Sequence, residues 1–352
     1  MSEYDNPLLG EWKTPFAVPP FDAIETGHYR PAFDSALESH RTEVASIGAE
    51  PAEPDFDNVI GALERSGDVL ERVASVFFNL CGSHTSEAMQ AIQREIAPVL
   101  ARHSTEILFN RDLFARISSL VERQAELGLD AEQARVLERY HTMFVRAGAL
   151  LEGGDRERMG EITQRLAVLG TQFGQNILAD EKAFELVLDG EGDLAGLPDF
   201  LVAAAAEAAR ERGHEGKHVI TLSRSLIEPF LQFSERRDLR ELAFRGWISR
   251  GENGGTTDNR AIVEETVKLR AERAKLLGFE NFAAFKVDDE MAKTPDAVRD
   301  LLMQVWAPAR RRAERERGKL QHMAQSEGGN FKIEAWDWRH YSEKVRQAEH
   351  DL

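Results

Sequence analysis

One short string combines residue types at a spacing that could bind a metal ion and activate water. Residues 214–218 read His-Glu-Gly-Lys-His, which is an H-E-x-x-H pattern. On a helix, the two histidines of this pattern lie four residues apart on one face and bind zinc, while the glutamate between them activates a zinc-bound water. His214, Glu215 and His218 are therefore the first candidate catalytic residues.

The residues around this string favour a turn instead of a helix. The string follows Gly213, contains Gly216 and leads directly into the strand-like residues 219–222. Glycines of this kind favour turns and interrupt helices. In a turning or extended backbone, the imidazoles of His214 and His218 would not share a face. We therefore expect loop histidines with solvated side chains.

A helical zinc site would also need a third ligand from a nearby helix. Glu228 and Glu235 are available, but the spacing favours neither. We predict no catalytic, cofactor-binding or metal-ligating residue in this chain and expect no zinc bound to it. The alternative is a self-contained zinc hydrolase that uses His214, Glu215 and His218.

The other reactive residue types suggest no catalytic site. Cys81 is the only cysteine, which excludes an internal disulfide, and its apolar neighbours predict a buried, unreactive thiol. Ser83 and His84 lie beside it without an oriented acid. The glycine-rich residues 251–255 lack the Lys-Ser or Lys-Thr of a phosphate-binding loop, so we expect a flexible connection there.

Composition and charge limit the possible partners. The chain has 352 residues, 42% of them hydrophobic and 30% charged, which is typical of a globular protein. A formal net charge of −17 would repel a phosphate backbone, so no nucleic acid is expected to bind. The start of the sequence is polar and acidic, and no long apolar run is present, so we expect a cytoplasmic protein without a membrane role.

Most of the chain follows helical periodicity. The clearest amphipathic stripe steps by three and four residues through Met159, Ile162, Leu166, Leu169, Phe173 and Ile177. Two further stripes cover residues 56–77 and 89–107, the second with an expected bend at Pro98. Thr294 and Pro295 predict the start of a long helix that Pro308 should kink or divide. Basic and acidic residues alternate over 310–317, which indicates an ion-paired helix face.

Two short runs depart from this helical pattern. Residues 184–188 and 219–222 read as strands, with a helix expected from about Asp199 to Arg212 between them. The predicted fold is mainly α, with a short two-stranded β element near 184–222. We expect a helical domain over 1–230 that contains this hairpin-like element. Residues 231–352 are expected to form the truncated start of a second helical domain.

Several segments together resemble the peptidyl-dipeptidase branch of the thimet oligopeptidase family of zinc metallopeptidases. The matching segments are N-P-L-L at 6–9, H-Y-R-P-A-F at 28–33, N-G-G at 253–255, L-R-A-E-R-A-K-L-L-G-F at 269–279, M-A-K-T-P at 291–295, G-N-F at 329–331 and W-D-W-R-H-Y at 336–341. They cover essentially the whole chain in the expected order. The family usually has two tyrosines where this chain has His340 and Tyr341, which leaves the role of that pair open.

The resemblance implies the neurolysin-like, multi-helix N-terminal half of a bacterial enzyme that releases C-terminal dipeptides from short peptides. Zinc is the cofactor in that family, and the family's zinc motif lies beyond the last residue of this sequence. The resemblance therefore implies a chain that is inactive alone. A helical peptide-binding or interaction module without catalysis is the alternative. Trp336 and Trp338 are expected to be exposed on a surface that normally packs against further structure and could support self-association.

Overall fold

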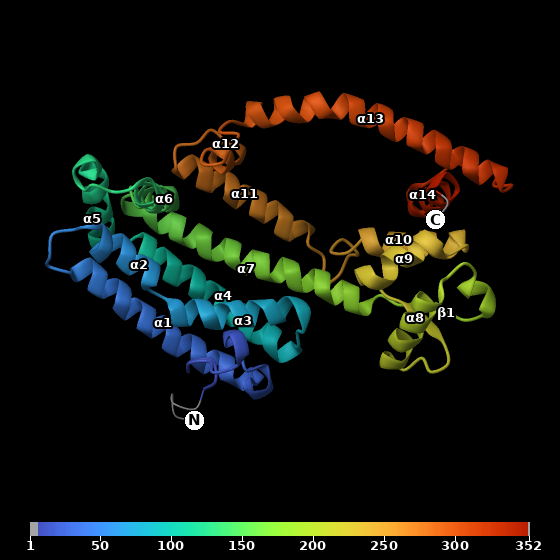
Figure 1. The fold of residues 1–352 in the computed structure, drawn as a ribbon, viewed down its shortest axis with the longest axis horizontal. Helices are drawn as coiled ribbons and strands as arrows, with labels where there is room; N and C mark the ends of the chain where they lie inside the picture. Colours follow the sequence, from blue (N-terminus) through green and yellow to red (C-terminus); the bar gives the residue numbers. More distant parts are fainter. Residues whose placement is uncertain (1–5, 351–352) are drawn as a thin grey trace. The chain divides into compact units, whose positions relative to one another are not determined.

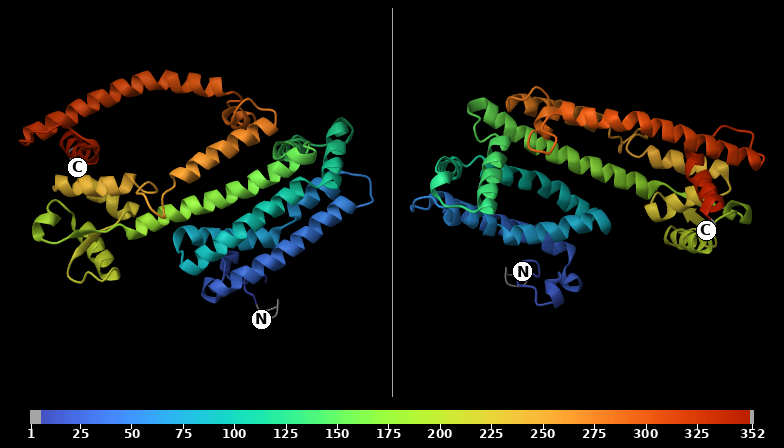
Figure 2. Two further views of the ribbon diagram at one scale, coloured as in Figure 1. Left: turned by 180° about the vertical axis from the view of Figure 1, so that it is seen from behind. Right: turned by 45° about the horizontal axis from the view of Figure 1, so that its top comes forward.

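A computed structural model describes residues 6–350. Helices dominate it, as Figures 1 and 2 show. The chain divides into two compact units: residues 1–172 with 265–282 form unit 1, and residues 173–264 with 283–352 form unit 2. No helix among residues 6–350 is long and apolar enough to cross a membrane.

Unit 1 is built from antiparallel and crossing helices. They are α1 (Thr26–Ala49), α2 (Ala62–Arg65), α3 (Asp68–Ser83), α4 (Glu87–Leu108), α5 (Arg111–Glu122), α6 (Ala131–Ala147), the first part of α7 (Gly153–Ala183) and most of α11 (Arg260–Leu276). One core lies between α1, α3 and α4 around Phe33 and Phe77. A second core joins the end of α1 to α2, α5 and α6 around Ile117 and Phe144.

The apolar stripe over 56–77 belongs to two helices. A single π-helical turn (Asp57–Gly61) leads into α2, and the chain then breaks at Ser66 and Gly67 before α3 begins. Gly67 has a φ of +79°, and its backbone N–H donates to Glu43 Oε2 at 2.8 Å. This left-handed conformation is accessible to glycine at little cost, so the helical periodicity continues across a break in the helix itself.

Unit 2 contains the small sheet and a second group of helices. Its elements are the end of α7, β1 (Leu186–Leu188), α8 (Asp199–Glu211), β2 (His218–Ile220), α9 (Arg224–Phe233), α10 (Arg237–Ile248), the start of α11, most of α12 (Phe282–Val287), α13 (Pro295–Ser326) and α14 (Ala335–His350). The two strands pair antiparallel, with Val187 opposite Val219. The prediction of a mainly α fold with one two-stranded element near 184–222 is confirmed.

The long helix α13 begins as predicted and runs further than expected. Thr294 Oγ1 accepts the backbone N–H of Ala297 at 3.2 Å, and Pro295 is the first helical residue. Pro308 does not divide the helix, which Figure 1 shows as a continuous curved ribbon. Residues 301–310 are all exposed, so water can bind the carbonyl that the proline leaves free, and the helix tolerates it.

The expectation that Trp336 and Trp338 are exposed is wrong. Trp336 and Trp338 are both half-buried, because Trp336 packs beside Phe244 and Arg237 and Trp338 packs against the core around Leu320. The exposed apolar side chains of unit 2 gather instead on α13. Leu301, Leu302, Met303, Val305 and Trp306 there are 56–62% exposed.

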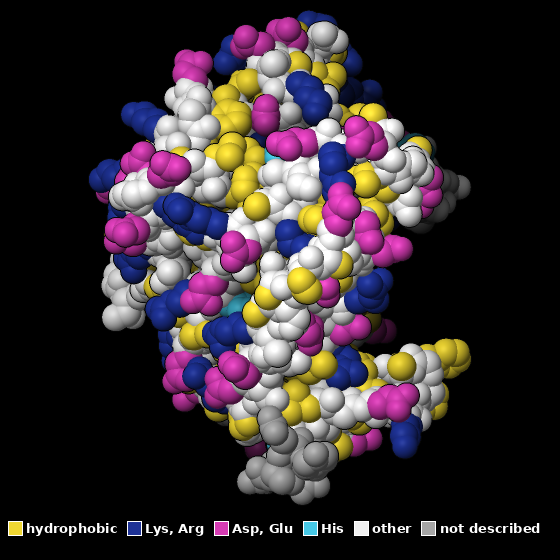
Figure 3. All heavy atoms as spheres, turned by 90° about the vertical axis from the view of Figure 1, so that its left-hand side faces the viewer, with side chains coloured by type: hydrophobic (Ala, Val, Ile, Leu, Met, Phe, Trp, Pro, Cys, Tyr) yellow, Lys and Arg dark blue, Asp and Glu magenta, His cyan; other side chains and the backbone are white. Residues whose placement is uncertain are grey.

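Charges on the surface are mixed in sign. On the face in Figure 3, Lys and Arg side chains are interspersed with Asp and Glu. The basic run on α13 follows this rule, since Arg312 Nε lies 2.6 Å from Glu316 Oε1. The predicted ion-paired face of that helix is confirmed.

Candidate functional site

The H-E-x-x-H string forms a turn followed by a strand, as predicted. His214 and Glu215 lie between the end of α8 and β2, and His218 is already the first residue of β2. Gly213 and Gly216 have φ values of +78° and +76°, which a continuing right-handed helix does not contain. The backbone that would place both imidazoles on one helical face is therefore not formed.

The side chains of the string are engaged elsewhere. His214 Nε2 lies 2.9 Å from Glu185 Oε2, and Oε1 of the same carboxylate lies 3.3 Å from Arg212 Nε. His218 stands opposite Leu188 in the sheet. Both histidines are half-buried, so the expectation of solvated side chains holds only in part, because Glu185 was not foreseen as a partner of His214.

These residues do not fit a catalytic zinc ion. Of the two further candidates, the Glu228 carboxylate is paired with Arg224 at 3.2 Å and with Arg339 at 3.5 Å. Among residues 6–350, no group of three or more His, Cys, Asp or Glu side chains is placed to hold a metal ion.

The other sequence candidates are also resolved. Cys81 is 5% exposed, and burial raises the pKa of its thiol to about 11, so the thiol stays protonated at neutral pH. The neighbouring Ser83 hydroxyl donates to Asn79 O at 2.9 Å instead of engaging His84. The predicted unreactive thiol agrees with both observations.

The glycine-rich loop after α10 is held firmly, which corrects the expectation of a flexible connection. Asp180, on α7, accepts hydrogen bonds from the backbone N–H of Gly251 at 2.7 Å, from Asn253 Nδ2 at 2.9 Å and from Thr257 Oγ1 at 2.6 Å. Although burial alone would raise it, these bonds lower the pKa of Asp180. One carboxylate thus orders the loop from a helix about seventy positions earlier.

A buried ionic network joins α10 to α14. Asp337 is completely buried, and its carboxylate accepts from Arg237 Nη2 at 2.9 Å and from Arg240 Nη2 at 2.9 Å. Arg240 is 1% exposed and also donates to Ser234 O at 2.6 Å and to Trp336 O at 3.3 Å. Burial lowers the pKa of Arg240, and the nearby Asp337 carboxylate opposes this change. Each charge is therefore compensated by fixed hydrogen bonds.

Two aromatic rings lie against Arg237, the more exposed arginine of this network. The guanidinium carbon of Arg237 lies 4.3 Å from the centre of the Phe331 ring and 5.6 Å from that of Trp336. An arginine between two ring faces is held by cation–π attraction as well as by its carboxylate. Within the W-D-W string, Asp337 therefore pairs with Arg237, and Trp336 contacts the same guanidinium group.

The network continues along α14 to α9. His340 Nδ1 lies 3.2 Å from Gln232 O, and burial, with nearby Arg240 and Lys344, lowers the pKa of His340 to about 4. Glu343 is 6% exposed and accepts from Gln232 Nε2 at 2.8 Å and Arg346 Nη2 at 2.6 Å. The bond from Arg346 does most to lower the pKa of Glu343 to about 2.

The residue types in this network could perform acid–base chemistry, but their burial indicates a structural role. Asp337, His340 and Glu343 are all at most 6% exposed, so a substrate cannot reach them. His340 remains a neutral imidazole that fixes α14 against α9. The network therefore positions α9, α10 and α14. The W-D-W-R-H-Y string at 336–341 contributes two of its members, Asp337 and His340.

The partners of Asp337 could not be found from the sequence alone. Arg237 and Arg240 lie about one hundred positions before it, and no local spacing connects them. The only available signal was the presence of two arginines three positions apart, in the segment that forms α10. That spacing places both side chains on one face, ready for a single carboxylate.

Comparisons with known proteins agree with the features described above. Residues 230–352, which contain the whole ionic network, match the family model described as Peptidase family M3. The chain is 40% identical over 347 residues to dipeptidyl carboxypeptidase of Escherichia coli (strain K12), a match that covers 99% of this chain and 51% of the relative. It is 32% identical to oligopeptidase A of the same organism over 97% of this chain and 50% of the relative.

More distant similarity extends to eukaryotic proteins. The chain is 24% identical to saccharolysin of Saccharomyces cerevisiae over 66% of this chain. It spans about half the length of the bacterial relatives it matches. The ordered match along nearly the whole chain, together with the family model over 230–352, shows that the chain belongs to peptidase family M3.

Proposed function

We propose that this chain forms the N-terminal part of a zinc peptidase that cleaves short peptides and releases C-terminal dipeptides. The observation that supports this most is the 40% identity to proteins named dipeptidyl carboxypeptidase, against 32% to those named oligopeptidase A. The identity extends over 99% of this chain, so it is not confined to one conserved segment.

Within that enzyme, we assign this chain a role in structure and peptide contact, without the zinc ligands. The support is geometric: the H-E-x-x-H string is a turn, and its histidines face different partners. The ionic network around Asp337 fixes helices α9, α10 and α14 as a rigid group. We therefore propose that the chain alone does not hydrolyse peptides.

Metal analysis and a peptidase assay of the purified chain test this assignment. We expect less than stoichiometric zinc and no release of dipeptides from a short peptide followed by mass spectrometry. The variant His214→Ala should behave like the parent in both measurements. One zinc ion per chain that is lost in His214→Ala would establish the turn as a metal site and reject the assignment.

A chimera tests the dipeptide product directly. This chain would replace the matching residues of the Escherichia coli dipeptidyl carboxypeptidase, leaving the remainder of that protein in place. We expect the chimera to release dipeptides from the C-terminus of a short peptide. Release of single amino acids, or cleavage only inside the peptide, would contradict the peptidyl-dipeptidase proposal while leaving the family unchanged.

Self-association of the chain is a further part of the proposal. Leu301, Leu302, Val305 and Trp306 share one face of α13 because they recur at helical spacing, and all are more than half exposed. An apolar face of this size on a helix usually marks a contact surface. Sedimentation velocity over a range of concentrations should show mass that rises with concentration, and a monomer throughout would contradict it.

The cytoplasmic location also stays a proposal. One relative is named probable cytosolic oligopeptidase A and another organellar oligopeptidase A, both from Arabidopsis thaliana. Members at this distance therefore occur in more than one compartment. Cys81 as a reduced, buried thiol is compatible with the cytoplasmic proposal.

A further inference from the structure

The first half of α13 carries an apolar stripe that no described part of the chain covers. Helical spacing aligns five apolar residues along one side of this helix: Val298, Leu302, Val305, Trp306 and Ala309. The three largest exposed side chains of this set, at 302, 305 and 306, are 56–61% exposed. Of the residues of α13, all of which the structure describes, only Leu320 and Ala324 are buried. The residues from 298 to 309 are called the open stripe below.

The open stripe continues an interface that is already formed. Leu320 follows Leu302 by eighteen residues, which is five helical turns, so the two side chains lie on the same side of α13. Leu320 and Ala324 pack against Tyr341 of α14. The side of the helix that is packed near its end is therefore open over the preceding turns. An exposed apolar surface of this kind usually marks a further contact.

The open part of α13 has little packing to stabilise it. Between residues 296 and 315, every side chain except that of Val298 is exposed. In proteins most of the stability of a helix comes from the packing of its apolar face. A surface that covered the open stripe would therefore stabilise this part of the helix.

Arginines border the open stripe on both sides. Arg299 and Arg310 are about three helical turns apart and lie on the side of Trp306, and Arg312 lies on the other side. A surface that fits here is apolar in the middle and carries carboxylates at its edge. A second copy of this chain fits less well, because its own arginine borders would meet these arginines.

About half of each bacterial relative has no counterpart in this chain. The match to the Escherichia coli dipeptidyl carboxypeptidase covers 99% of this chain and 51% of the relative. The open stripe lies within residues 230–352, the part that matches the family model. A covering surface within the same polypeptide acts at a high effective concentration, which a separate partner does not have.

We propose that the open stripe of α13 is the contact surface for the half of the family protein that this chain does not match. The covering surface is apolar and places carboxylates against Arg299, Arg310 and Arg312. This proposal rests on the proposed function, because it takes the chain as part of a longer peptidase. In the isolated chain the same stripe supports the self-association expected above, which the missing half would prevent.

Oxidative footprinting with hydroxyl radicals tests the cover. Leu302 and Trp306 are the probes, and the isolated chain is compared with the chimera described above, both at concentrations at which they sediment as monomers. We expect both side chains to be oxidised at least about fivefold more slowly in the chimera, because the centre of an interface excludes water. Equal rates in an active chimera would overturn the proposal.

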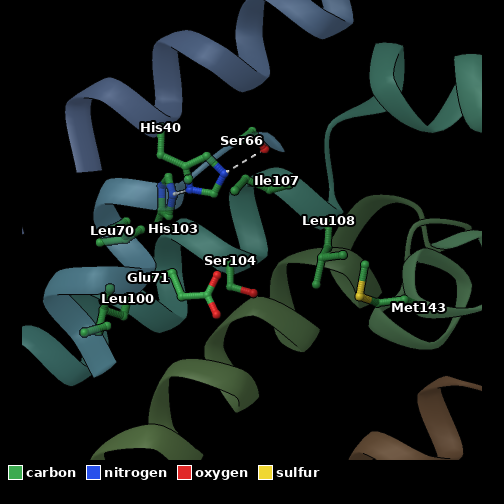
Figure 4. Close-up of a pocket in the computed structure, with 12 residues that line it drawn as sticks. His40, Ser66, Leu70, Glu71, Leu100, His103, Ser104, Ile107, Leu108 and Met143 are labelled. Atoms are coloured by element: carbon green, nitrogen blue, oxygen red, sulfur yellow. Dashed lines mark hydrogen bonds between the residues drawn. The ribbon is translucent and has the colours of Figure 1, made fainter. Parts of the chain in front are cut away.

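Met143 is the internal control for this measurement. It is 44% exposed and lines a cavity in unit 1, where His103 Nε2 lies 2.9 Å from His40 Nδ1 (Figure 4). Its oxidation should proceed at the same rate in both proteins. Slowing of Met143 by the same factor as Trp306 would overturn the assignment of the contact to α13.

One substitution measured in two proteins provides a second test. Trp306→Ser should leave the melting midpoint of the isolated chain nearly unchanged, because the side chain is largely exposed there, and lower that of the chimera by several degrees. Phe200→Ser is the matched control, since this aromatic residue of α8 is 59% exposed, and it should shift both proteins equally. Equal shifts by Trp306→Ser in the two proteins would overturn the proposal.

The natural relative gives a measurement that does not depend on folding of the chimera. In the isolated chain, residues 296–315 should exchange their amide hydrogens rapidly. The matching segment of the Escherichia coli dipeptidyl carboxypeptidase should exchange at least about tenfold more slowly, because its helix is covered. Equally rapid exchange there would overturn the proposal. Slow exchange there, with a folded chimera that releases no dipeptides, would support the contact surface and reject the proposed function.

Discussion

Replacing Asp337 by alanine should lower the free energy of unfolding of unit 2 by about 3–5 kcal/mol. The carboxylate is completely buried, and it compensates Arg240, which is 1% exposed and has no access to water. Removing it would leave a buried guanidinium without a counter-ion. Asp337 also accepts the backbone N–H of Glu334 at 3.1 Å, so the start of α14 would lose its cap.

Chemical denaturation combined with hydrogen exchange would measure this effect. Exchange in Asp337→Ala should accelerate in α10 and α14, the two helices that the carboxylate joins. Asp337→Asn retains an acceptor of the same shape, so a smaller loss is expected from it. Asp296→Ala is the control, because its ion pair with Arg299 is exposed and should contribute less than about 1 kcal/mol. Equal losses in the alanine variants at 337 and 296 would contradict the scaffold role.

The sequence predicted the elements whose pattern is local. The stripe from Met159 to Ile177 lies within α7. Strands were predicted at 184–188 and 219–222, and the antiparallel pair covers 186–188 and 218–220. Thr294 with Pro295 marks the start of α13 because a cap depends on only three or four neighbouring residues. The turn at 214–218 was predictable for the same reason, since two glycines in five residues decide the backbone.

Features that depend on distant residues could not be predicted. The burial of Trp336 and Trp338 requires knowing that α10 and the core around Leu320 cover them. The order of the loop at 251–257 comes from Asp180, on another helix. Burial and charge compensation are properties of the packed helices, whereas periodicity reports only which face of a helix is apolar.

Residue types and spacing alone do not determine which side chains meet, as residues 214–218 and the pair of His40 and His103 show. The residues at 214–218 had the right types at the right spacing, yet their backbone does not form a helix. His40 and His103 have no recognisable spacing, and they meet because α1 and α4 pack together. The H-E-x-x-H pattern alone suggests a site, whereas its two glycines correctly predict a turn; the contact between His40 and His103 has no signal in the sequence.

Replacing Phe77 by alanine should destabilise unit 1 by about 3–5 kcal/mol, the range observed when a buried phenylalanine is truncated. Phe77 is fully buried, and its ring centre lies 5.0 Å from that of Tyr29 and 5.3 Å from that of Phe33. These edge-to-face contacts join α3 to α1, so the variant would leave a cavity and lose favourable ring contacts together.

The adjacent residue provides a matched control for this change. Phe78 is the same residue type on the same helix but is 37% exposed, so Phe78→Ala should cause a clearly smaller loss. The two rings also touch, at 5.2 Å between centres, so the double variant should lose less than the sum of the single losses. Equal losses at 77 and 78 would contradict the burial that distinguishes them.

Hydrogen exchange then separates the two units. If each unit is stabilised chiefly by its own core, Phe77→Ala should accelerate exchange in α1 and α3 and leave α10 and α14 largely protected. Asp337→Ala should give the reverse pattern, because its partners all lie in unit 2. Acceleration of all four helices in both variants would instead show that the units unfold together, and the losses would then be measured against the stability of the whole chain.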